Sequence, residues 1–257
     1  MVCKDQLNRN LLFPNPPKRI VSLVPSQTEL LVDLGLEKCI VGVTRFCVHP
    51  KEIRKKVAIV GGTKKIHLDK IKALQPDIII CNKEENTKEI VGQLMNVAPV
   101  WVSDIYTMED TIEMIFLLGK LFDVSEKAEY LISNISLEKK DFEAFVKTKP
   151  QYKVAYVIWK NPYMVAGNQT FINSLLALNH FKNIADNLES RYPEVSIQDL
   201  KNADKIFLSS EPFPFKEKHI QELQKATGKE VVLVDGEYFS WYGSRLQKAF
   251  SYFKTLH

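Results

Sequence analysis

The sequence predicts an α/β protein with two Rossmann-like lobes, each built on a parallel sheet, joined by one long α-helix. Three observations support this prediction. Short apolar runs alternate with amphipathic helical segments over most of the chain, which is the pattern of parallel sheets covered by helices. The stretch from Asp123 to Lys149 contains neither Gly nor Pro. Residues 68–80 are also echoed by residues 197–208, so a similar unit occurs in each half.

In the first half, five apolar runs are the expected strands: residues 19–24, 40–44, 57–60, 77–81 and 99–103. Amphipathic or capped segments between them are the expected helices: residues 26–35, 68–74, 85–95 and 108–121. Ser26 is the expected N-cap of the first helix, and Glu29 stands three residues later, the spacing of a capping box.

The long helix is expected over residues 123–149. Asp123 is its expected N-cap, and Glu126 has capping-box spacing. Apolar residues recur at three- and four-residue steps, which is a helical period. At 1.5 Å per residue such a helix is about 40 Å long, the breadth of a small domain. We therefore predict an N-terminal lobe at 1–122 and a C-terminal lobe at 150–257, with one long helix inside a single domain as the alternative.

The second half repeats the alternation of strands and helices. Strands are expected at residues 152–159, 163–166, 205–208 and 230–234, and helices at residues 170–178, 195–202, 215–225 and 240–255. The echoed segments imply two lobes related by approximate twofold symmetry. A ligand cleft between the lobes is expected at the carboxyl ends of the strands, where open α/β sheets bind ligands.

Composition and motifs exclude several functions. The formal charge of +4 comes from 35 basic and 31 acidic residues, too mild and mixed a balance to predict nucleic-acid binding. The four cysteines form no CxxC pair, and the five histidines show no i, i+4 pairing. Nucleotide-binding, serine-hydrolase and zinc-protease motifs are absent. We therefore predict no catalytic residue, no metal ligand and no intrinsic cofactor.

Two features bear on localisation. No run reaches the roughly 18 apolar residues that span a membrane. Residues 1–13 are polar and lack the apolar core of a signal peptide. A cytoplasmic protein and a protein whose export signal has been removed both remain open.

Aromatic and polar side chains follow several expected strands or begin an expected helix. The candidates for ligand contact are Arg45, Phe46, Trp159, Tyr192, Tyr238, Trp241 and Arg245. Aromatic side chains in strand-end loops suit a flat, partly apolar ligand. The alternative is that they pack on the cores of the lobes. For Trp159 and Trp241 the two readings have equal weight, whereas Trp101, inside a strand, is expected in the core.

Four motifs in order, RIVSLVPSQTELL at 19–31, VGVTR at 41–45, VGG at 60–62 and LDKIKALQPDIII at 68–80, resemble the substrate-binding proteins of ABC importers for metal chelates. That family takes up cobalamin, haem and iron–siderophores. Segments in the second half, NP at 161–162, RYPEVS at 191–196 and FSWYGSR at 239–245, are most similar to the vitamin B12-binding branch.

The resemblance implies residue roles. Near the cleft it places six side chains, with Trp241 close by: Phe46, Asn82, Trp159, Met164, Tyr192 and Tyr238. Asn82 stands where cobalamin binders can carry an aromatic residue. The family docks its permease through one acidic residue on each lobe. Asp69 occupies the first position, and Gln198, with Asp199 beside it, occupies the second.

The expected function is binding of a metal chelate, cobalamin first, and its delivery to an ABC importer by a monomer in the periplasm or cell envelope. An iron–siderophore or haem binder of the same fold is the first alternative. An intracellular chelate-binding or tetrapyrrole-handling protein without a permease is the second. An enzyme acting on a tetrapyrrole and a scaffold with an empty cleft are further alternatives.

Overall fold

The computed structural model describes residues 2–257, and contacts between residues divide the chain into two units. Unit 1 comprises the chain up to Ile105, then Glu109–Ser136 and Tyr242–Gln247. Unit 2 comprises Tyr106–Met108, Leu137–Trp241 and Lys248–His257. The predicted lobes are continuous segments that end at residue 122 and begin after residue 149, whereas each of these units combines three segments of the chain. The lobe boundaries therefore stay a prediction.

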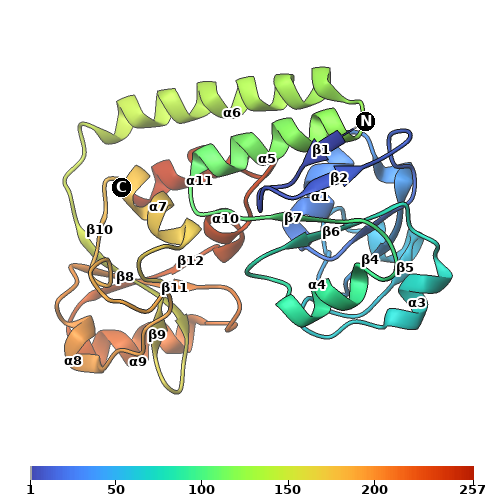
Figure 1. The fold of residues 1–257 in the computed structure, drawn as a ribbon. Helices are drawn as coiled ribbons and strands as arrows, with labels where there is room; N and C mark the ends of the chain where they lie inside the picture. Colours follow the sequence, from blue (N-terminus) through green and yellow to red (C-terminus); the bar gives the residue numbers. More distant parts are fainter. Residues whose placement is uncertain (1) are drawn as a thin grey trace. The chain divides into compact units, whose positions relative to one another are not determined.

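Unit 1 is built on a five-stranded parallel sheet with the strand order β5-β4-β3-β6-β7 (Figure 1). Its strands are β3 (Ile20–Ser22), β4 (Ile40–Val43), β5 (Ala58–Ile59), β6 (Ile78–Asn82) and β7 (Val100–Ser103). Every residue of β6 is buried, as expected for a central strand of a sheet covered on both faces. The predicted parallel sheet of the first half is confirmed.

The helices of this part of the chain are α1 (Pro25–Asp33), α2 (Ile53–Lys56), α3 (Leu68–Ala73), α4 (Lys88–Leu94) and α5 (Met108–Leu121), with a 3-10 turn η1 at Glu37–Cys39. α1 begins at Pro25, and its N-cap, Val24, makes no side-chain cap. Proline suits the first helical position because its missing N–H would have no partner there. The predicted capping box of Ser26 and Glu29 is therefore wrong, and both residues lie inside the helix.

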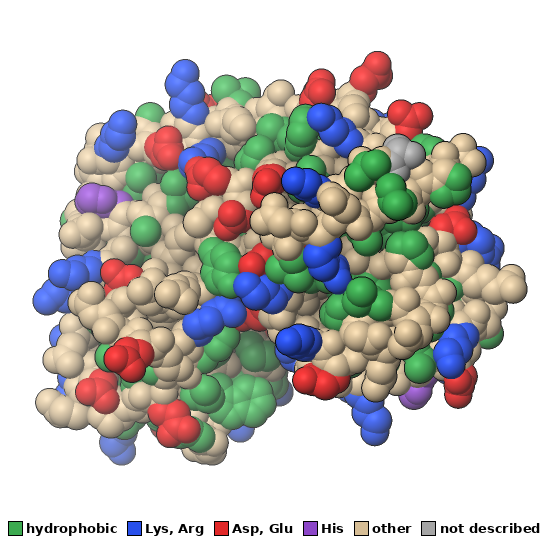
Figure 2. Space-filling model, in the orientation of Figure 1, with side chains coloured by type: hydrophobic (Ala, Val, Ile, Leu, Met, Phe, Trp, Pro, Cys, Tyr) green, Lys and Arg blue, Asp and Glu red, His purple; other side chains and the backbone are tan. Residues whose placement is uncertain are grey.

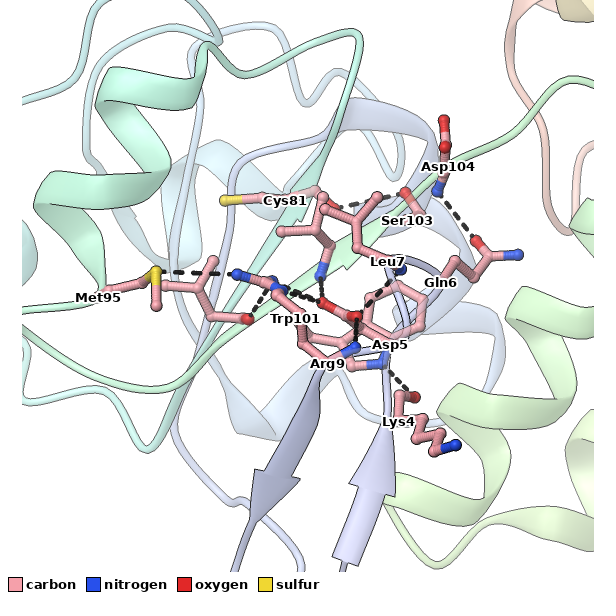
Figure 3. A network of polar contacts seen from close by, with 12 residues as sticks. Lys4, Asp5, Gln6, Leu7, Arg9, Cys81, Met95, Trp101, Ser103 and Asp104 are labelled. Carbon is pink, nitrogen blue, oxygen red and sulfur yellow. Dashed lines mark hydrogen bonds and ion pairs between the residues drawn. The ribbon is translucent and has the colours of Figure 1, made fainter.

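A two-stranded hairpin precedes the sheet of unit 1. It pairs β1 (Val2–Lys4) with β2 (Asn10–Leu12) in antiparallel register. This hairpin was not predicted from the sequence. In the connecting turn, the Asp5 carboxylate accepts a hydrogen bond from the Val102 backbone N–H at 3.2 Å, and the Gln6 N–H donates to the Val102 carbonyl at 3.2 Å. These bonds hold the hairpin turn against edge strand β7 (Figure 3), so the N–H and carbonyl groups of Val102 on that edge have partners.

The long helix α6 spans Ser125–Val146, which is 22 residues or about 33 Å (Figure 1). It is shorter at both ends than the predicted segment. Asp123 has φ 56°, whereas an N-cap residue normally has an extended backbone, so the predicted capping role of Asp123 is wrong. In unit 2 the buried Phe142 of α6 packs on Phe250 and Phe253, with ring centroids 5.7 and 5.9 Å apart.

Unit 2 has a second sheet with the order β10-β8-β11-β12, and these neighbours are parallel. Its strands are β8 (Lys153–Trp159), β10 (Lys182–Asn183), β11 (Lys205–Ser209) and β12 (Glu230–Val234), and β9 (Met164–Val165) adds to β8 in antiparallel register. The apolar side of this unit includes a buried cluster around Ala155, Ile206 and Leu223. The prediction of parallel sheets is confirmed here too, apart from β9.

The helices of unit 2 are α7 (Phe171–Leu178), α8 (Ile197–Leu200), α9 (Glu217–Thr227), α10 (Gly236–Ser240) and α11 (Leu246–Phe253), with a final 3-10 turn η2 at Lys254–Leu256; the first two residues of α11 belong to unit 1. The single helix predicted at 240–255 is wrong. The chain leaves helical geometry after Ser240, and Gly243 has φ +112°, a backbone conformation that favours glycine.

The surface is mixed in charge. Figure 2 shows Lys and Arg side chains interspersed with Asp and Glu over the visible face, with hydrophobic side chains between them. Among residues 2–257, no helix has both the length and the apolar character needed to cross a membrane.

Candidate functional site

In unit 1, Arg45 and Phe46 follow β4 and lie together. The Arg45 guanidinium carbon is 4.8 Å from the centroid of the Phe46 ring, a cation–π distance. Both side chains are exposed, and Phe46 has 46% of its surface accessible. A Cβ on Gly62 would lie 3.0 Å from the Phe46 ring and 3.7 Å from Arg45 Nε. Arg45 and Phe46 therefore form a pair that rests against the backbone at Gly62.

Asn82 ends β6 and is only 2% exposed. Its Nδ2 donates to the Ser103 carbonyl at 3.2 Å and to Ser103 Oγ at 3.0 Å, while its Oδ1 accepts from the N–H groups of Glu84 and Glu85 at 2.9 and 3.0 Å. The side-chain oxygen of Asn82 thus holds the turn after β6, while its N–H₂ group ties the end of β6 to Ser103 at the end of β7. The structure gives Asn82 a turn-forming position, and direct ligand contact stays a prediction.

Carboxylates also gather after β6. Burial raises the pKa of the Glu85 carboxyl above its ordinary value, although the nearby Lys64 opposes the shift. Burial likewise raises the pKa of the Tyr242 hydroxyl well above its ordinary range, with Glu85 and Glu84 contributing through their charges. Tyr242 therefore stays neutral at all ordinary pH values. Glu85 was not predicted as a site residue, because a glutamate next to another glutamate in a charged loop carries no signal of burial.

Arg245 is committed to an ion pair within unit 1. Its Nε and Nη2 donate to the two carboxylate oxygens of Glu29 at 3.0 and 2.9 Å. Burial raises the pKa of the Glu29 carboxyl, and Arg245 opposes that shift. The bidentate pair fixes the segment after α10 to α1, so its geometry favours a structural role for Arg245. Its predicted ligand contact stays a prediction.

In unit 2, three of the predicted residues come together beside β8 and β9. Trp159 and Met164 are register partners across these two strands, and Met164 also forms a β-bridge with Glu194. The segment that bears Tyr192 therefore runs next to β9. Trp159 is 41% exposed, and its ring meets Phe213 edge-to-face with centroids 5.6 Å apart.

The aromatic surface beside Trp159 continues into residues that the sequence analysis missed. Phe213 packs on Phe215 at 4.6 Å and on His219 at 5.6 Å. Desolvation lowers the pKa of His219, and its Nδ1 accepts the Lys216 N–H at 2.9 Å. Two phenylalanines spaced by one proline after a buried strand were the available signal.

Tyr238 and Trp241 belong to the end of α10. Tyr238 stacks on Tyr252 with centroids 4.7 Å apart. Trp241 is only 7% exposed, and its Nε1 donates to Glu211 Oε1 at 3.0 Å. Of the two readings weighed for the tryptophans, the burial of Trp241 favours packing and the exposure of Trp159 favours ligand contact.

The predicted docking residues lie on short helices. Asp69 is exposed in the first turn of α3, and Gln198 is exposed in α8. Asp199 completes a capping box with Ser196, because its Oδ2 accepts from the Ser196 N–H and hydroxyl at 2.8 and 2.7 Å. These hydrogen bonds hold the pKa of Asp199 below its ordinary value. Asp199 therefore carries a structural role as well as a negative charge.

Metal-binding clusters and surface grooves also bear on the site. Across residues 2–257, no group of three or more His, Cys, Asp and Glu side chains is arranged to hold a metal ion. A groove of about 790 Å³ lies in unit 1, lined by residues that precede its strands, among them Lys18, Asp77 and Pro99, and by Phe13 and Phe122. None of the predicted site residues lines this groove.

Proteins that are similar to this chain in sequence carry names that fit the predicted family. An uncharacterized ABC transporter substrate-binding lipoprotein, YvrC of Bacillus subtilis (strain 168), is 28% identical over 189 residues, 70% of this chain and 60% of that protein. The vitamin B12-binding protein of Pectobacterium carotovorum subsp. carotovorum (strain PC1) is 24% identical over 234 residues, 90% of this chain and 84% of that protein. The chain spans 60% of YvrC and 66% of the vitamin B12-binding protein of Vibrio parahaemolyticus.

Solved structures share the fold. The periplasmic vitamin B12 binding protein BtuF of Vibrio cholerae superposes with a TM-score of 0.81 at 20% identity, covering 94% of this chain and 97% of that one. The apo periplasmic heme-binding protein RhuT of Roseiflexus sp. RS-1 superposes with a TM-score of 0.79 at 19% identity, covering 93% and 97%. At these identities the likeness shows the fold.

The family itself is shown by sequence. A sequence model of the family described as periplasmic binding protein matches residues 20–237, which is most of the chain. The predicted absence of enzymatic activity agrees with that family, whose members bind solutes rather than transform them. This chain belongs to the periplasmic binding protein family.

Proposed function

We propose that this protein binds a metal chelate, with cobalamin the first candidate, and delivers it to an ABC importer. One observation carries the proposal: in each unit an exposed aromatic side chain stands at the carboxyl end of a parallel strand. Phe46 follows β4 in unit 1 and is 46% exposed; Trp159 ends β8 in unit 2 and is 41% exposed. Large apolar rings left in water at the ligand-binding edge of a sheet suit a flat apolar ligand.

The relatives narrow the ligand class. Several are named vitamin B12-binding proteins, and structural neighbours include heme-binding proteins. We assign direct contact to the accessible candidates, which are Arg45, Phe46, Trp159, Met164, Tyr192 and Tyr238. We assign supporting roles to Asn82, Trp241 and Arg245, because their polar groups bond within their own unit.

Membership of the family is also the basis for proposing a partner and a location. We propose that the protein acts as a monomer in the cell envelope and meets an ABC permease through Asp69 and through the α8 surface at Gln198 and Asp199. Asp69 is exposed and supplies one of the negative charges. The α8 surface supplies the other only through Asp199, which also caps its helix. That double use favours a second candidate function, a chelate-binding protein that works without a permease.

A titration with cyanocobalamin tests the proposal directly. Trp101 is fully buried and Trp241 is 7% exposed, so Trp159 is the tryptophan most open to a ligand. We expect saturable quenching at one ligand per chain, with most of the quenching lost in Trp159→Phe. Removing an aromatic side chain at the centre of a binding site costs about 2 kcal/mol, so Trp159→Ala is expected to weaken binding roughly 30-fold.

Tyr130→Ala is the matched control, since Tyr130 is a 71% exposed aromatic residue on α6. Its affinity is expected to equal that of the wild type. Equal affinities of Trp159→Ala and wild type would remove the proposed contact. Binding of haem or a ferric siderophore, without binding of cobalamin, would keep the chelate-binding function and change the ligand.

A further inference from the structure

The pair formed by Arg45 and Phe46 is held in place before any ligand arrives. The Arg45 N–H donates to the Gly61 carbonyl at 2.8 Å, and the Phe46 N–H donates to Thr44 Oγ1 at 3.2 Å. Arg54 donates to the Arg45 carbonyl at 3.0 Å. The backbone that bears both side chains is therefore fixed by three hydrogen bonds, while the side chains themselves face water.

The charge of Arg45 has no internal carboxylate partner in the described part of the chain. Its guanidinium contacts the Phe46 ring, and no carboxylate oxygen lies within ion-pair distance of it. Two other cationic side chains of unit 1 are paired with carboxylates: Lys83 lies 2.6 Å from Asp104, and Arg245 binds Glu29. A guanidinium held against an aromatic face and left without an anion has its donors free for an incoming oxygen.

The loop after β5 adds to this positive character. Lys64 and Lys65 are both exposed, and Lys64 Nζ donates only to a backbone carbonyl, that of Glu84, at 2.5 Å. This loop contains Gly62, against which the Arg45–Phe46 pair rests. The Arg45–Phe46 pair thus lies beside a loop that carries two exposed lysines.

We propose that the Arg45–Phe46 pair recognises an anionic oxygen group of the chelate, either a phosphodiester or a carboxylate. The Phe46 ring contacts the apolar part of the ligand, and the Arg45 guanidinium donates hydrogen bonds to the anionic oxygens beside it. This inference rests on the proposed function. It goes further because it makes Arg45 the residue that distinguishes anionic chelates from those lacking such a group.

Three ligands separate the two sources of the anion. Cyanocobalamin carries a nucleotide phosphodiester, dicyanocobinamide has the same corrin ring without that phosphodiester, and hemin carries two carboxylates. Each is titrated by calorimetry into the wild type, Arg45→Gln and Arg45→Lys. Lys88→Gln is the control, because it removes one exposed positive charge at the start of α4. Circular dichroism establishes that each variant is folded.

We expect Arg45→Gln to weaken binding of the anionic ligand roughly 10- to 100-fold, the range for losing a charge-assisted hydrogen bond. Arg45→Lys is expected to recover part of this loss, because lysine keeps the charge but not the planar fork. Lys88→Gln is expected to bind as the wild type does. A loss for cobalamin and not for cobinamide identifies the phosphodiester, and a loss for hemin identifies the carboxylates.

Two results would overturn this inference while leaving the proposed function in place. One is an unchanged affinity of Arg45→Gln for every ligand that the wild type binds. The other is an equal loss for cobinamide and cobalamin, which would mean that Arg45 acts on the corrin ring alone. If the wild type binds none of the three ligands, the proposed function itself fails, whatever the variants show.

Discussion

Asp5 is expected to be among the most sensitive single residues for the stability of unit 1. Its side chain is fully buried and accepts hydrogen bonds from the backbone N–H groups of Leu7, Arg9 and Val102 at 3.0, 2.9 and 3.2 Å. The Arg9 side chain adds an ion pair through Nε at 2.8 Å and Nη2 at 2.5 Å (Figure 3). Asp5→Asn keeps the shape of the side chain but removes its charge and turns an N–H₂ group toward these donors.

The expected loss follows from these contacts. Breaking a buried ion pair by changing one partner costs about 3–5 kcal/mol. Arg9 keeps 28% of its side-chain surface exposed, so water can solvate part of its freed charge. We therefore expect Asp5→Asn to lower the free energy of unfolding by the lower end of this range, about 3 kcal/mol. For a chain of this size, that loss corresponds to a midpoint of thermal unfolding lower by roughly 6–12 °C.

The assay is urea and thermal unfolding followed by circular dichroism. Asp104→Asn is the matched control, because it changes the same chemical group in an ion pair that is open to water: the Lys83 side chain is 51% exposed and that of Asp104 20%. Such exposed pairs contribute less than about 1 kcal/mol. The reasoning is refuted if Asp5→Asn unfolds within about 0.5 kcal/mol of Asp104→Asn.

Two further predictions concern pH and backbone space. Burial, together with Lys149, lowers the pKa of His257 from 6.5 to about 4. Between these two pH values the unfolded chain binds the proton more readily than the folded chain. The contribution of neutral His257 to stability is therefore complete above pH 6.5 and is lost as the pH falls toward 4. His257→Phe should therefore lose less stability than the wild type in urea unfolding between pH 7 and 4, and parallel losses would contradict this. A Cβ on Gly167 would lie 2.8 Å from the Ser190 carbonyl oxygen, whereas one on Gly92, inside α4, meets nothing within 4 Å. Thermal unfolding should show Gly167→Ala destabilised by about 1–3 kcal/mol and Gly92→Ala stabilised by about 0.5–1 kcal/mol; a neutral Gly167→Ala would contradict the predicted clash.

The long helices and central strands could be predicted because their signals are local. α5 begins and ends at the predicted residues 108 and 121, and β12 at 230 and 234. A run without Gly or Pro and with a helical apolar period predicted α6, although the helix itself is Ser125–Val146. Its ends were harder to predict because the left-handed backbone of Asp123 leaves no trace in the hydrophobic pattern.

The candidate site could be predicted only in part. The pattern of aromatic residues after strands identified Phe46 and Trp159, which the structure leaves exposed. For Trp241 the same pattern gave ligand contact and core packing equal weight, but the indole N–H of Trp241 bonds to Glu211, thirty residues earlier in the chain. It gave no sign that Phe213 would pack on Trp159. Exposure depends on which distant segment covers a side chain, and a local pattern does not carry that information.

By itself, the sequence determined the alternation of strands and helices, the long helix and the family motifs, since these depend on apolar periods and on residues within a few positions of one another. Only the tertiary structure decided the hairpin held by the bond from Val102 to Asp5, 97 residues apart, and the break before α11, where Arg245 pairs with Glu29, 216 residues away. Such contacts form when folding brings distant charges together in a buried place, where an unpaired charge would be costly. That requirement, rather than local propensity, decides which polar side chains hold the fold and which remain available to a ligand.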